Sequence, residues 1–486
     1  MDLYKISNNI PQYVHNVADI LHENGFKAYL VGGAVRDLIL NKDPKDYDIA
    51  TDALPEQMEK IFPRCVTTNA RFGTILVIMD DASAERFDVE VTTFRKEENY
   101  FGGRWPANVE FTSDIIEDLS RRDFTINAMA IDLNRIVDNT TTVEEILIDP
   151  YKGQEDLHNR LIRAVRDPVE RFSEDGLRAY KACRLASELQ FSLDEQTFNA
   201  IKKCLSVAEM ISIERIRDEF NKLIKYSAKP SRGLNLLLTS GLLKLFIPEL
   251  IECIGVVQPE FHEDDVYTHS LKVLDRAEDS IKLAALFHDI GKARTKTVDN
   301  NGKVHFYGHD QKGAEMTKEI LTRLKYPKLE ILRVVNLIKW HMFYYPSADW
   351  RKVNEINSID AEEVPNIGGW SDSAIRRFIK NVGEEFIDDI FKLRIADATS
   401  NNKTQFNNKE IEALQKRISE VKAKEMVLKI EDLAIDGFDL VKLGVKPGPA
   451  MGKILNTLLS YVIEDPINNN KEVLKNKVIE LMKNIQ

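Results

Sequence analysis

The sequence has few cysteines and no long apolar run. Its 486 residues include four cysteines, Cys65, Cys183, Cys204 and Cys253, and no two of them form a CxxC pair. This spacing favours neither a thiolate zinc site nor a disulfide framework, so we expect reduced thiols in the core. A membrane span needs a run of about 18 apolar residues, and a secretory signal needs an apolar amino-terminal stretch. The sequence contains neither, so we expect a cytoplasmic protein without a membrane partner.

Basic residues are fewer than acidic ones. Lys and Arg number 67 and Asp and Glu 78, which gives a net charge of −11. Unspecific nucleic-acid binding depends on Lys and Arg that neutralise phosphates, so this balance disfavours it as the main role of the chain. Residues 160–184 nevertheless contain seven basic and four acidic side chains. A nucleic-acid partner would therefore bind through local basic strips of this kind.

The hydrophobic pattern predicts an α+β fold that begins with a small mixed α/β head. Apolar residues recur near the helical period from Ile10 to Leu21, and strand-like runs cover residues 28–31, 73–79 and 87–91. From Glu155 onward the pattern is almost wholly helical. We therefore place the head at residues 1–145 and expect helical regions after it.

Two further breaks divide the helical part. Pro, Gly and Ser interrupt the pattern at residues 227–233, and a polar stretch covers residues 400–408. After it comes a helix with one apolar face, formed by Ile411, Leu414, Ile418 and Val421. At about 150 residues per domain the length indicates roughly three domains. The pattern divides the chain into four segments: the head, a helical neck at 146–230, a helical domain at 231–400 and a tail at 401–486.

A glycine turn at the end of the first strand is a candidate phosphate-binding element. The strand at residues 29–31 leads into Gly32 and Gly33, which precede an apolar helix. Glycine lets the backbone approach a ligand closely, and the first N–H groups of a helix can bind an anion. Arg36 adds a donor for a bidentate phosphate contact. An ordinary turn is the alternative interpretation.

Carboxylates on two extended segments form a candidate metal site. Asp46 and Asp48 lie two residues apart, so their side chains point to the same face of an extended segment, and Glu90 lies on the polar face of the strand at residues 87–91. Oxygen ligands of this kind favour Mg²⁺. Three carboxylates around two Mg²⁺ ions, beside a triphosphate, are suited to in-line nucleotidyl transfer. A solvated acidic strand face is the alternative.

These residues lie in an ordered series of motifs: GGAVRD, DYDIAT, EVTTFR, RRDFTINAMA, DPYKGQEDL, IRAVRDPVERFSEDGLRAYKACRLA and IERIRDEF. The series spans about the first 225 residues and resembles the class II tRNA nucleotidyltransferase and bacterial poly(A) polymerase family of the DNA polymerase beta superfamily. The resemblance implies that Asp46 and Asp48 hold Mg²⁺ with Glu90 as the third carboxylate. It also implies triphosphate binding by the glycine turn and Arg36, and nucleotide binding by Arg122, Asp123 and Asn127.

Asp175 and Arg178 are candidates for reading the base. We expect them on one helical stretch, as i and i+3 neighbours. Cytosine and adenine each present an amine donor beside a ring-nitrogen acceptor, which a carboxylate and a guanidinium can match, whereas uracil and guanine present the reverse. A surface ion pair is the alternative, but in the family Glu-Asp-x-x-Arg selects the nucleotide. Lys181 and Arg184 match basic positions that follow, although a lysine cannot make a bidentate phosphate contact.

The stretch at residues 94–120 is rich in Gly, charged and aromatic residues. On its pattern alone it is a β-excursion. In the family, this stretch is a flexible loop that helps the site change from CTP to ATP, and members that add only CC have it shortened. Its full length here favours a product that ends in A, which is compatible with complete CCA addition and with A addition alone.

Histidines gather in the middle of the chain and indicate a second metal site. Six of the nine lie between His262 and His341. His288 and Asp289 follow an apolar segment in LAALFHDIGK. With His269 and Asp397 from helical stretches before and after, they form a ligand set suited to Mn, Fe, Ni, Zn or Mg.

The arrangement resembles the HD phosphohydrolase family, whose metals activate water for phosphoester hydrolysis. His309 and His341 match positions that complete a second metal in some members. The resemblance implies phosphatase or 2′,3′-cyclic phosphodiesterase activity. An inactive HD fold that serves as a helical spacer is the alternative.

Near the carboxyl end, the phrase GVKPGPAMGK contains Lys446 and Lys453 and predicts a tight turn before a helix. It resembles the tRNA-binding tail of family members, and the long basic tail of bacterial poly(A) polymerases is absent. We therefore expect a tRNA nucleotidyltransferase that uses CTP and ATP to add CCA, or its terminal A. The alternatives are a poly(A) polymerase, an HD phosphohydrolase with an idle head and a purely RNA-binding module. The sequence does not determine the oligomeric state.

Overall fold

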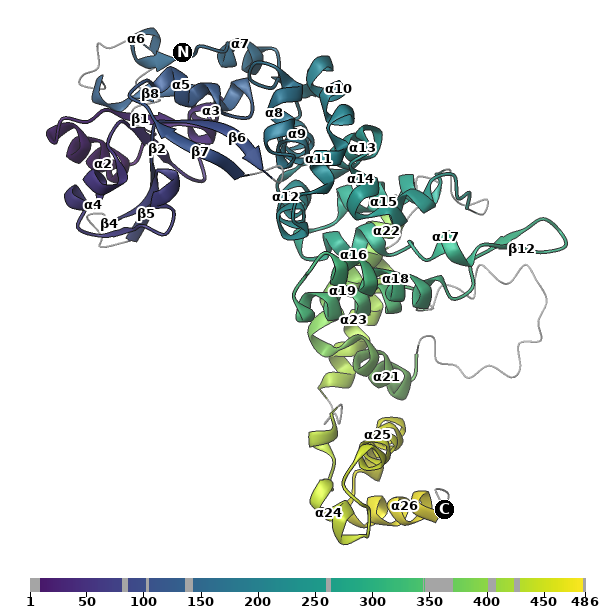
Figure 1. Cartoon of the computed structure of the whole chain (residues 1–486). Helices are drawn as coiled ribbons and strands as arrows, with labels where there is room; N and C mark the ends of the chain where they lie inside the picture. Colours follow the sequence, from purple (N-terminus) through teal and green to yellow (C-terminus); the bar gives the residue numbers. More distant parts are fainter. Residues whose placement is uncertain are drawn as a thin grey trace. The chain divides into compact units, whose positions relative to one another are not determined.

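A mixed seven-stranded sheet organises the amino-terminal part of the computed structural model (Figure 1), in the order β3-β4-β5-β2-β1-β8-β9. Its strands are β1 (Ala28–Val31), β2 (Asp48–Thr51), β3 (Cys65–Val66), β4 (Thr74–Asp80), β5 (Arg86–Thr93), β8 (Ala130–Asp132) and β9 (Leu147–Ile148). β2 and β5 pair in parallel and the other neighbours antiparallel. The three strands expected from the sequence are therefore β1, β4 and β5, within two residues at each end.

The structure describes residues 9–80, 86–101, 105–135, 143–258, 264–343, 345, 370–400, 408–423 and 429–483. The chain divides into two compact units, Met1–Ile251 and Glu252–Gln486. His262 and most of the predicted linker at 400–408 lie outside the described residues. The finer domain boundaries at 145, 230 and 400 stay predictions.

Short helices and a hairpin complete the head. The helices are α2 (Gln12–Glu23), α3 (Gly33–Ile39), α4 (Pro55–Ile61), α5 (Ile115–Ser120) and α6 (Val143–Ile146). The predicted apolar face of the first helix is buried, with Val14, Val17 and Leu21 all fully enclosed. β6 (Arg95–Phe101) and β7 (Trp105–Phe111) form a separate antiparallel hairpin, so the stretch after Phe94 is a β-excursion.

The neck is helical, as predicted. Its helices are α7 (Gly153–His158), α8 (Pro168–Glu174), α9 (Leu177–Glu188), α10 (Glu195–Lys203), α11 (Leu205–Glu209) and α12 (Ile213–Tyr226), with the short pair β10 (Leu161–Ile162) and β11 (Ser192–Leu193). In the first unit, α13 (Pro230–Ser240) and α14 (Leu243–Phe246) follow the neck. α9 packs against α12 and α13. The predicted break at 227–233 separates α12 from α13, because Pro230 begins the second helix.

The second unit is helical except for one small hairpin among its described residues, β12 (Thr297–Val298) and β13 (Val304–His305). Its helices are α15 (Val266–Arg276), α16 (Lys282–Phe287), α17 (Lys292–Thr295), α18 (His309–Arg323), α19 (Lys328–Trp340), α21 (Asp372–Val382), α22 (Ile387–Ser400), α23 (Lys409–Lys422), α24 (Gly437–Lys442), α25 (Pro449–Glu464) and α26 (Lys471–Lys483). The last three pack around a core of their own. None of the described helices is long and apolar enough to cross a membrane.

Candidate active site and metal centre

The sheet brings the three predicted carboxylates to one region of the head. In the parallel pair of β2 and β5, Asp48 lies directly opposite Glu90. Asp46 comes two residues before Asp48, at the entry to β2. Burial, together with the nearby charges of Glu90 and Asp46, raises the pKa of Asp48 to about 6, although Arg122 opposes this shift. A group of acids that repel one another in this way is suited to hold a cation.

Gly32 allows the turn before α3 to lie against this site. Its φ angle is +75°, and a Cβ at this position would lie 3.2 Å from Arg122 Nη1 and 3.6 Å from Asp48 Oδ2. A side chain would therefore strain the backbone and crowd both the predicted catalytic carboxylate and the arginine. The predicted turn is present, and α3 begins at Gly33.

A cavity of about 430 Å³ opens beside the turn. The predicted residues that line it are Gly32, Gly33, Arg36, Asp46, Asp48, Arg122, Asp123, Asn127, Lys181 and Arg184. Arg36 Nη1 donates to Asn127 Oδ1 at 2.8 Å, Asn127 Nδ2 donates to Asp123 Oδ1 at 3.1 Å, and Lys181 Nζ lies 3.7 Å from Asp123 Oδ2. The wall of the cavity is thus a connected polar chain, with its cations directed at the same space as the carboxylates.

A second cavity of about 530 Å³ adjoins the first and shares Arg122, Asp123, Asn127 and Lys181 with it. It contains the remaining predicted residues, Glu90, Asp175 and Arg178. The structure therefore collects all residues predicted for the head and the neck around two joined cavities. Their roles stay predictions.

The backbone around Asp175 differs from the expected continuous helix. Asp175 has extended φ and ψ angles of −140° and 104°, and it separates α8 from α9. Its Oδ1 accepts a hydrogen bond from the backbone N–H of Leu177 at 3.0 Å. This contact stabilises a new helix start at α9, so α8 does not continue through Asp175. The prediction of one helical stretch over residues 174–178 was therefore wrong, although both side chains do reach the cavity.

Different neighbouring groups orient the side chains of the two candidate base readers, Asp175 and Arg178. Asp175 Oδ2 accepts from Arg215 Nη2 of α12 at 3.1 Å. Arg178 donates to Glu174 Oε2 at 2.7 Å and to the carbonyl of Arg121 at 2.8 Å. The two residues share a backbone hydrogen bond, from the N–H of Arg178 to the carbonyl of Asp175 at 3.0 Å, while the contacts above orient their side chains.

Sequence reasoning missed several residues of this site. Arg215 and Asp118 were part of the recognised stretches but carried no pattern that distinguishes them from surface charges. Other lining residues that were missed are Lys45, Asn69, Arg71, Arg121 and Lys222. Only the tertiary fold brings them to the cavities, because they come from separate segments of the chain.

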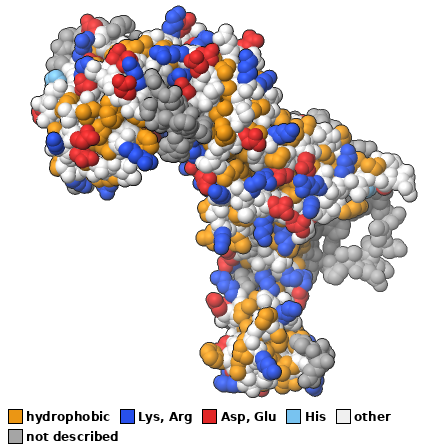
Figure 2. Space-filling view, viewed as in Figure 1, with side chains coloured by type: hydrophobic (Ala, Val, Ile, Leu, Met, Phe, Trp, Pro, Cys, Tyr) orange, Lys and Arg blue, Asp and Glu red, His pale blue; other side chains and the backbone are white. Residues whose placement is uncertain are grey.

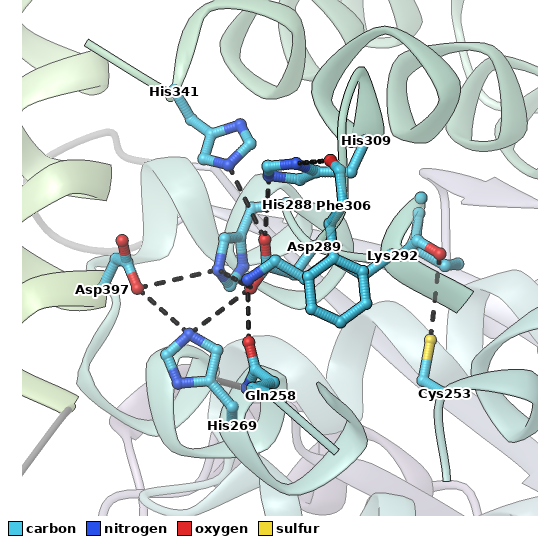
Figure 3. Close-up of polar contacts among 12 residues, drawn as sticks. Cys253, Gln258, His269, His288, Asp289, Lys292, Phe306, His309, His341 and Asp397 are labelled. Carbon is cyan, nitrogen blue, oxygen red and sulfur yellow. Dashed lines mark hydrogen bonds and ion pairs between the residues drawn. The ribbon is translucent and has the colours of Figure 1, made fainter. Parts of the chain in front are cut away.

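The six predicted ligands of the second site converge in the middle of the second unit (Figure 3). His269 lies on α15, Asp397 on α22, and His288 with Asp289 directly after α16. His309 begins α18, and His341 follows α19. All of these side chains are at least four-fifths buried.

The two oxygens of Asp289 face two different groups of ligands. Oδ2 lies 3.2 Å from His288 Nε2 and 3.7 Å from His269 Nε2. Oδ1 lies 3.5 Å from His309 Nε2 and 3.7 Å from His341 Nε2. Asp397 Oδ1 completes the first group, 3.0 Å from His269 Nε2. The geometry thus resembles two ligand sets bridged by one carboxylate.

The ring orientation of three of these histidines suits metal ligands. The Nδ1 atoms of His288, His309 and His341 lie 2.9, 2.8 and 2.6 Å from backbone carbonyls, so each ring donates there and turns Nε2 to the centre. Those three Nε2 atoms are buried without a hydrogen-bond partner. Burial lowers the pKa of His309, which favours the neutral form that binds metals. Buried ring nitrogens without a hydrogen-bond partner are expected where these nitrogens bind a cation.

A lysine shares the central carboxylate. Lys292 Nζ lies 2.6 Å from Asp289 Oδ2 and 2.8 Å from Gln258 Oε1 (Figure 3). Burial raises the pKa of Asp289, but His288 and Lys292 outweigh this and hold it well below its ordinary value. The carboxylate is therefore ionised and available to a cation.

In the tail, Lys446 and Lys453 are exposed on either side of the start of α25. The turn before that helix is present as predicted, with Gly448 as N-cap and Pro449 as the first helical residue. Their role in RNA binding stays a prediction.

Known protein families match along most of the chain. A Poly A polymerase head domain matches residues 28–163, and a probable RNA- and SrmB-binding site of polymerase A matches residues 190–254. An HD domain matches residues 266–402, and a putative domain 2 of tRNA nucleotidyltransferase matches residues 377–478. The two joined cavities thus lie mainly in the first matched region and the histidine centre in the HD region.

Individual relatives match nearly the full length. The CCA-adding enzyme of Pediococcus pentosaceus is 31% identical over 95% of this chain and 96% of its own, and that of Limosilactobacillus reuteri is 33% identical over 95% of each. A crystal structure of the Bacillus stearothermophilus CCA-adding enzyme in complex with CTP is similar at 25% identity, with a TM-score of 0.65 over 97% of this chain and 98% of that one.

Proposed function

The chain belongs to the family of CCA-adding enzymes, and we propose that it is a tRNA nucleotidyltransferase that adds CCA to tRNA 3′ ends from CTP and ATP. Relatives of that name cover nearly its whole length, and the similar Bacillus stearothermophilus enzyme binds CTP. The hairpin of β6 and β7 retains the segment expected for A addition. That segment is compatible with complete CCA addition and with addition of A alone, and the names of the relatives favour complete addition.

One observation carries the proposal: Asp48 lies opposite Glu90 in register, at cavities that also contain Asp175 and Arg178. Nucleotidyl transfer needs a cluster of carboxylates beside the α-phosphate and a means of choosing the base. Here both lie around connected space. The carboxylates face the end of the nucleotide that reacts, and the aspartate and arginine face the end that is read.

Divalent-cation dependence is a property of the family, and we propose Mg²⁺ for this pocket. The donors Asp46, Asp48 and Glu90 offer only oxygen, which suits a hard cation. Burial, and then repulsion from Glu90 and Asp46, raise the pKa of Asp48, and a cation would relieve that repulsion. When bound, such ions activate the primer 3′-hydroxyl and stabilise the leaving pyrophosphate. The identity of the metal remains a proposal.

The cationic wall of the smaller cavity suits the triphosphate. Arg36 and Arg184 are mostly buried and already oriented by acidic or amide partners, Arg184 by Glu188 at 2.6 Å and Glu219 at 2.7 Å. A held guanidinium loses little freedom when it binds phosphate. Lys181 supplies a third cation, tethered only loosely at 3.7 Å from Asp123.

Four incubations test the activity. A tRNA that ends at the discriminator base and a tRNA that ends in CC are each supplied with CTP or ATP alone. We expect C addition to the first tRNA and A addition to the second. If the first tRNA accepts no C while the second accepts A, complete CCA addition is wrong. If neither accepts a nucleotide, the transferase assignment is wrong.

The carboxylates are tested on the same substrates. Glu90→Ala should lower the rate of transfer by at least about a hundredfold, since a group that acts on developing charge contributes on that scale. Asp88→Ala is the matched control, because Asp88 lies two residues away on β5, pairs with Arg86 at 3.1 Å and lines neither cavity. Equal losses in both variants would contradict the assigned role of Glu90.

A poly(A) polymerase would use the same head. The match of residues 377–478 to a tRNA nucleotidyltransferase domain favours tRNA instead. Product length separates the two: a CCA-adding enzyme stops after three nucleotides on tRNA, whereas a poly(A) polymerase extends generic RNA many times. We propose that Lys446 and Lys453 of the tail contact tRNA, and that the enzyme acts in the cytoplasm.

The HD centre supports a second candidate activity. We propose that its six side chains hold one or two divalent metals such as Mn, Ni, Fe or Mg, and that it hydrolyses phosphomonoesters or 2′,3′-cyclic phosphates. The specific support is the set of three buried Nε2 atoms without a hydrogen-bond partner, all directed at Asp289. An HD fold that serves only as a spacer would not need buried ring nitrogens without hydrogen-bond partners.

Release of phosphate from a model ester tests this activity. His288→Ala should abolish hydrolysis and leave nucleotidyl transfer unchanged, and Asp48→Asn should have the opposite effects. Hydrolysis that survives the loss of His288 would place the activity elsewhere. No hydrolysis by the wild-type protein with any of the four metals would make the centre structural.

A further inference from the structure

Asp118 is a fully buried carboxylate near the end of α5, and it lines neither of the two joined cavities among the described residues. Its Oδ1 accepts from Arg121 Nε at 3.0 Å and Nη2 at 2.8 Å, and its Oδ2 accepts from Arg122 Nη2 at 3.1 Å. A buried charge is costly unless it is paired, so these two arginines are what keep it there. Burial raises the pKa of Asp118, but Arg121 and Arg122 together hold it below its ordinary value.

The two arginines serve different parts of the nucleotide site. Arg122 lines both cavities, and its charge opposes the raised pKa of Asp48. Arg121 lines the larger cavity, and its carbonyl accepts from Arg178 Nη2 at 2.8 Å. The position of Arg121 therefore sets one of the anchors of the residue proposed to read the base.

Asp118 also contacts the start of the hairpin. The backbone N–H of Arg95 donates to Asp118 Oδ1 at 3.4 Å, and Arg95 is the first residue of β6 and a lining residue of the larger cavity. One carboxylate thus connects the side of the site near Asp48, the base-reading arginine and the segment expected to help the change from CTP to ATP.

We propose that Asp118 is a positioning residue for the nucleotide site, which holds Arg121, Arg122 and the start of β6 in the arrangement that selects CTP and ATP. The inference rests on the proposed function. It adds to the residues of the nucleotide site one residue, Asp118, that lines neither cavity. The competing explanation is a buried ion pair that stabilises the fold and has no effect on selection.

The test compares isosteric substitutions of two aspartates that each accept a two-nitrogen contact from an arginine. Asp118→Asn keeps the shape but removes the charge. We expect the KM for CTP and for ATP to rise about tenfold, the scale of a lost charge-assisted hydrogen bond. We also expect a smaller fall in kcat, an unchanged KM for tRNA and a higher ratio of UTP to CTP incorporation. A purely structural role would lower the fraction of active enzyme and leave KM and the base ratio unchanged.

Asp389→Asn is the matched control. Asp389 lies in the second unit, is 13% exposed and accepts Nε of Arg333 at 2.9 Å together with a second nitrogen of the same guanidinium. It is thus the same kind of Asp–Arg fork, outside the nucleotide site. We expect a comparable fall in melting temperature with wild-type KM values. If Asp118→Asn behaves like this control, the proposal is overturned.

A second variant covers the case in which Asp118→Asn does not fold. Arg121→Lys keeps both charges but loses the two-nitrogen contact with Oδ1. We expect the same rise in KM and in UTP use, and wild-type values in this variant would overturn the proposal. Where both variants fold, their combination should change KM by less than the product of the single changes, because both act through one contact. Independent effects would contradict the inference.

The wild-type control separates the failure of the proposed function from the failure of the role of Asp118. If the wild-type protein transfers no nucleotide to tRNA, the proposed function is overturned and the role of Asp118 with it. If the wild-type protein transfers C and A normally and the Asp118 and Arg121 variants keep its KM and base ratio, the role of Asp118 alone is overturned.

Discussion

Gly291 shows that the candidate metal centre depends on the absence of one side chain. A Cβ on this residue would lie 2.1 Å from the carbonyl oxygen of His309 and 2.5 Å from the backbone nitrogen of Gly313. Both contacts are far below a van der Waals distance and both involve backbone, which cannot rotate away. The glycine in HDIGK therefore lets the start of α18 approach closely enough to bring His309 to Asp289.

We predict that Gly291→Ala displaces the start of α18 and weakens the ligand set of His309 and His341. The variant should bind fewer divalent ions than the wild type in a metal titration, and it should lose about 2 kcal/mol or more of stability, as overpacked sites do. Gly452→Ala is the control, since a Cβ there meets no atom within 4 Å. Unchanged metal stoichiometry in Gly291→Ala would contradict the prediction.

The ionised side chain of Asp48 lowers the free energy of unfolding, because it is buried beside other carboxylates. Its pKa in the folded protein is about 6, raised by burial and by Glu90 from 3.8. At a pH between the ordinary pKa of 3.8 and the folded-state pKa of about 6, Asp48 binds a proton in the folded state but not in the unfolded state. Hence the stabilising effect of the protonated group is present below about pH 4 and is lost as the pH rises to about 6.

We therefore predict that Asp48→Asn stabilises the metal-free protein at pH 7 by about 1 to 3 kcal/mol, since each pKa unit corresponds to about 1.4 kcal/mol. Urea unfolding in the presence of a chelator measures this, and the gain should vanish at about pH 4. The same variant should be inactive in transfer. A variant less stable than the wild type at pH 7 without metal would refute the prediction.

At the scale of secondary-structure elements, α12 supports the junction of α8 and α9. Arg215 on α12 contacts both oxygens of Asp175, at 3.1 and 3.5 Å, across the gap between the helices. We predict that Arg215→Met raises the KM for CTP and ATP about tenfold and increases the incorporation of UTP, because Asp175 loses its orientation. Steady-state assays with each nucleotide measure both effects.

Arg217→Met is the control for this prediction, because Arg217 lies on the same helix, pairs with Asp218 at 2.8 Å and lines neither cavity. It should keep wild-type KM values for nucleotides. If both substitutions change base choice equally, α12 acts through general stability and not through Asp175.

Helix α23 and the junction of α8 and α9 show what the sequence could predict and what it could not. The face of α23 was predicted from its period, and Ile411, Leu414, Ile418 and Val421 are all buried. Local periodicity carries that information. The break at Asp175 was missed. Its hydrogen bond with Leu177 is local, but Arg215 of a distant helix also contacts Asp175, and a Cβ on Gly176 would lie 2.6 Å from the carbonyl of Val207. Such contacts exist only after the chain has folded.

The candidate sites divide in the same way. Motifs located the carboxylates, the glycine turn and the six candidate ligands of the HD centre, since these residues carry their chemistry in their own type and spacing. Asp118 and Arg215 are distinguished by the side chains that they contact. A charged residue in a helical segment looks the same in the sequence whether it faces water or another residue, so only the structure distinguishes them.

At the scale of the whole molecule, the net charge of −11 must be reconciled with a tRNA substrate. Figure 2 shows Lys and Arg side chains distributed among Asp and Glu over the face that is drawn, without a field of one sign. Part of the acidity lies in the two candidate metal-binding centres. Binding then depends on a few local contacts with phosphate, which also allows release of each finished tRNA.

We predict that Lys446→Ala together with Lys453→Ala raises the KM for tRNA by about tenfold, and that the dependence of log KM on log salt becomes shallower by about 1.5, since each lost phosphate contact releases one counterion fewer. The KM for CTP should not change. Lys475→Ala together with Lys477→Ala removes the same charge from α26, where the two lysines pair with Glu472 at 2.9 Å and Glu480 at 2.8 Å, and should have little effect. A tRNA affinity that is unchanged in the double variant would mean that the tail lysines do not contact RNA.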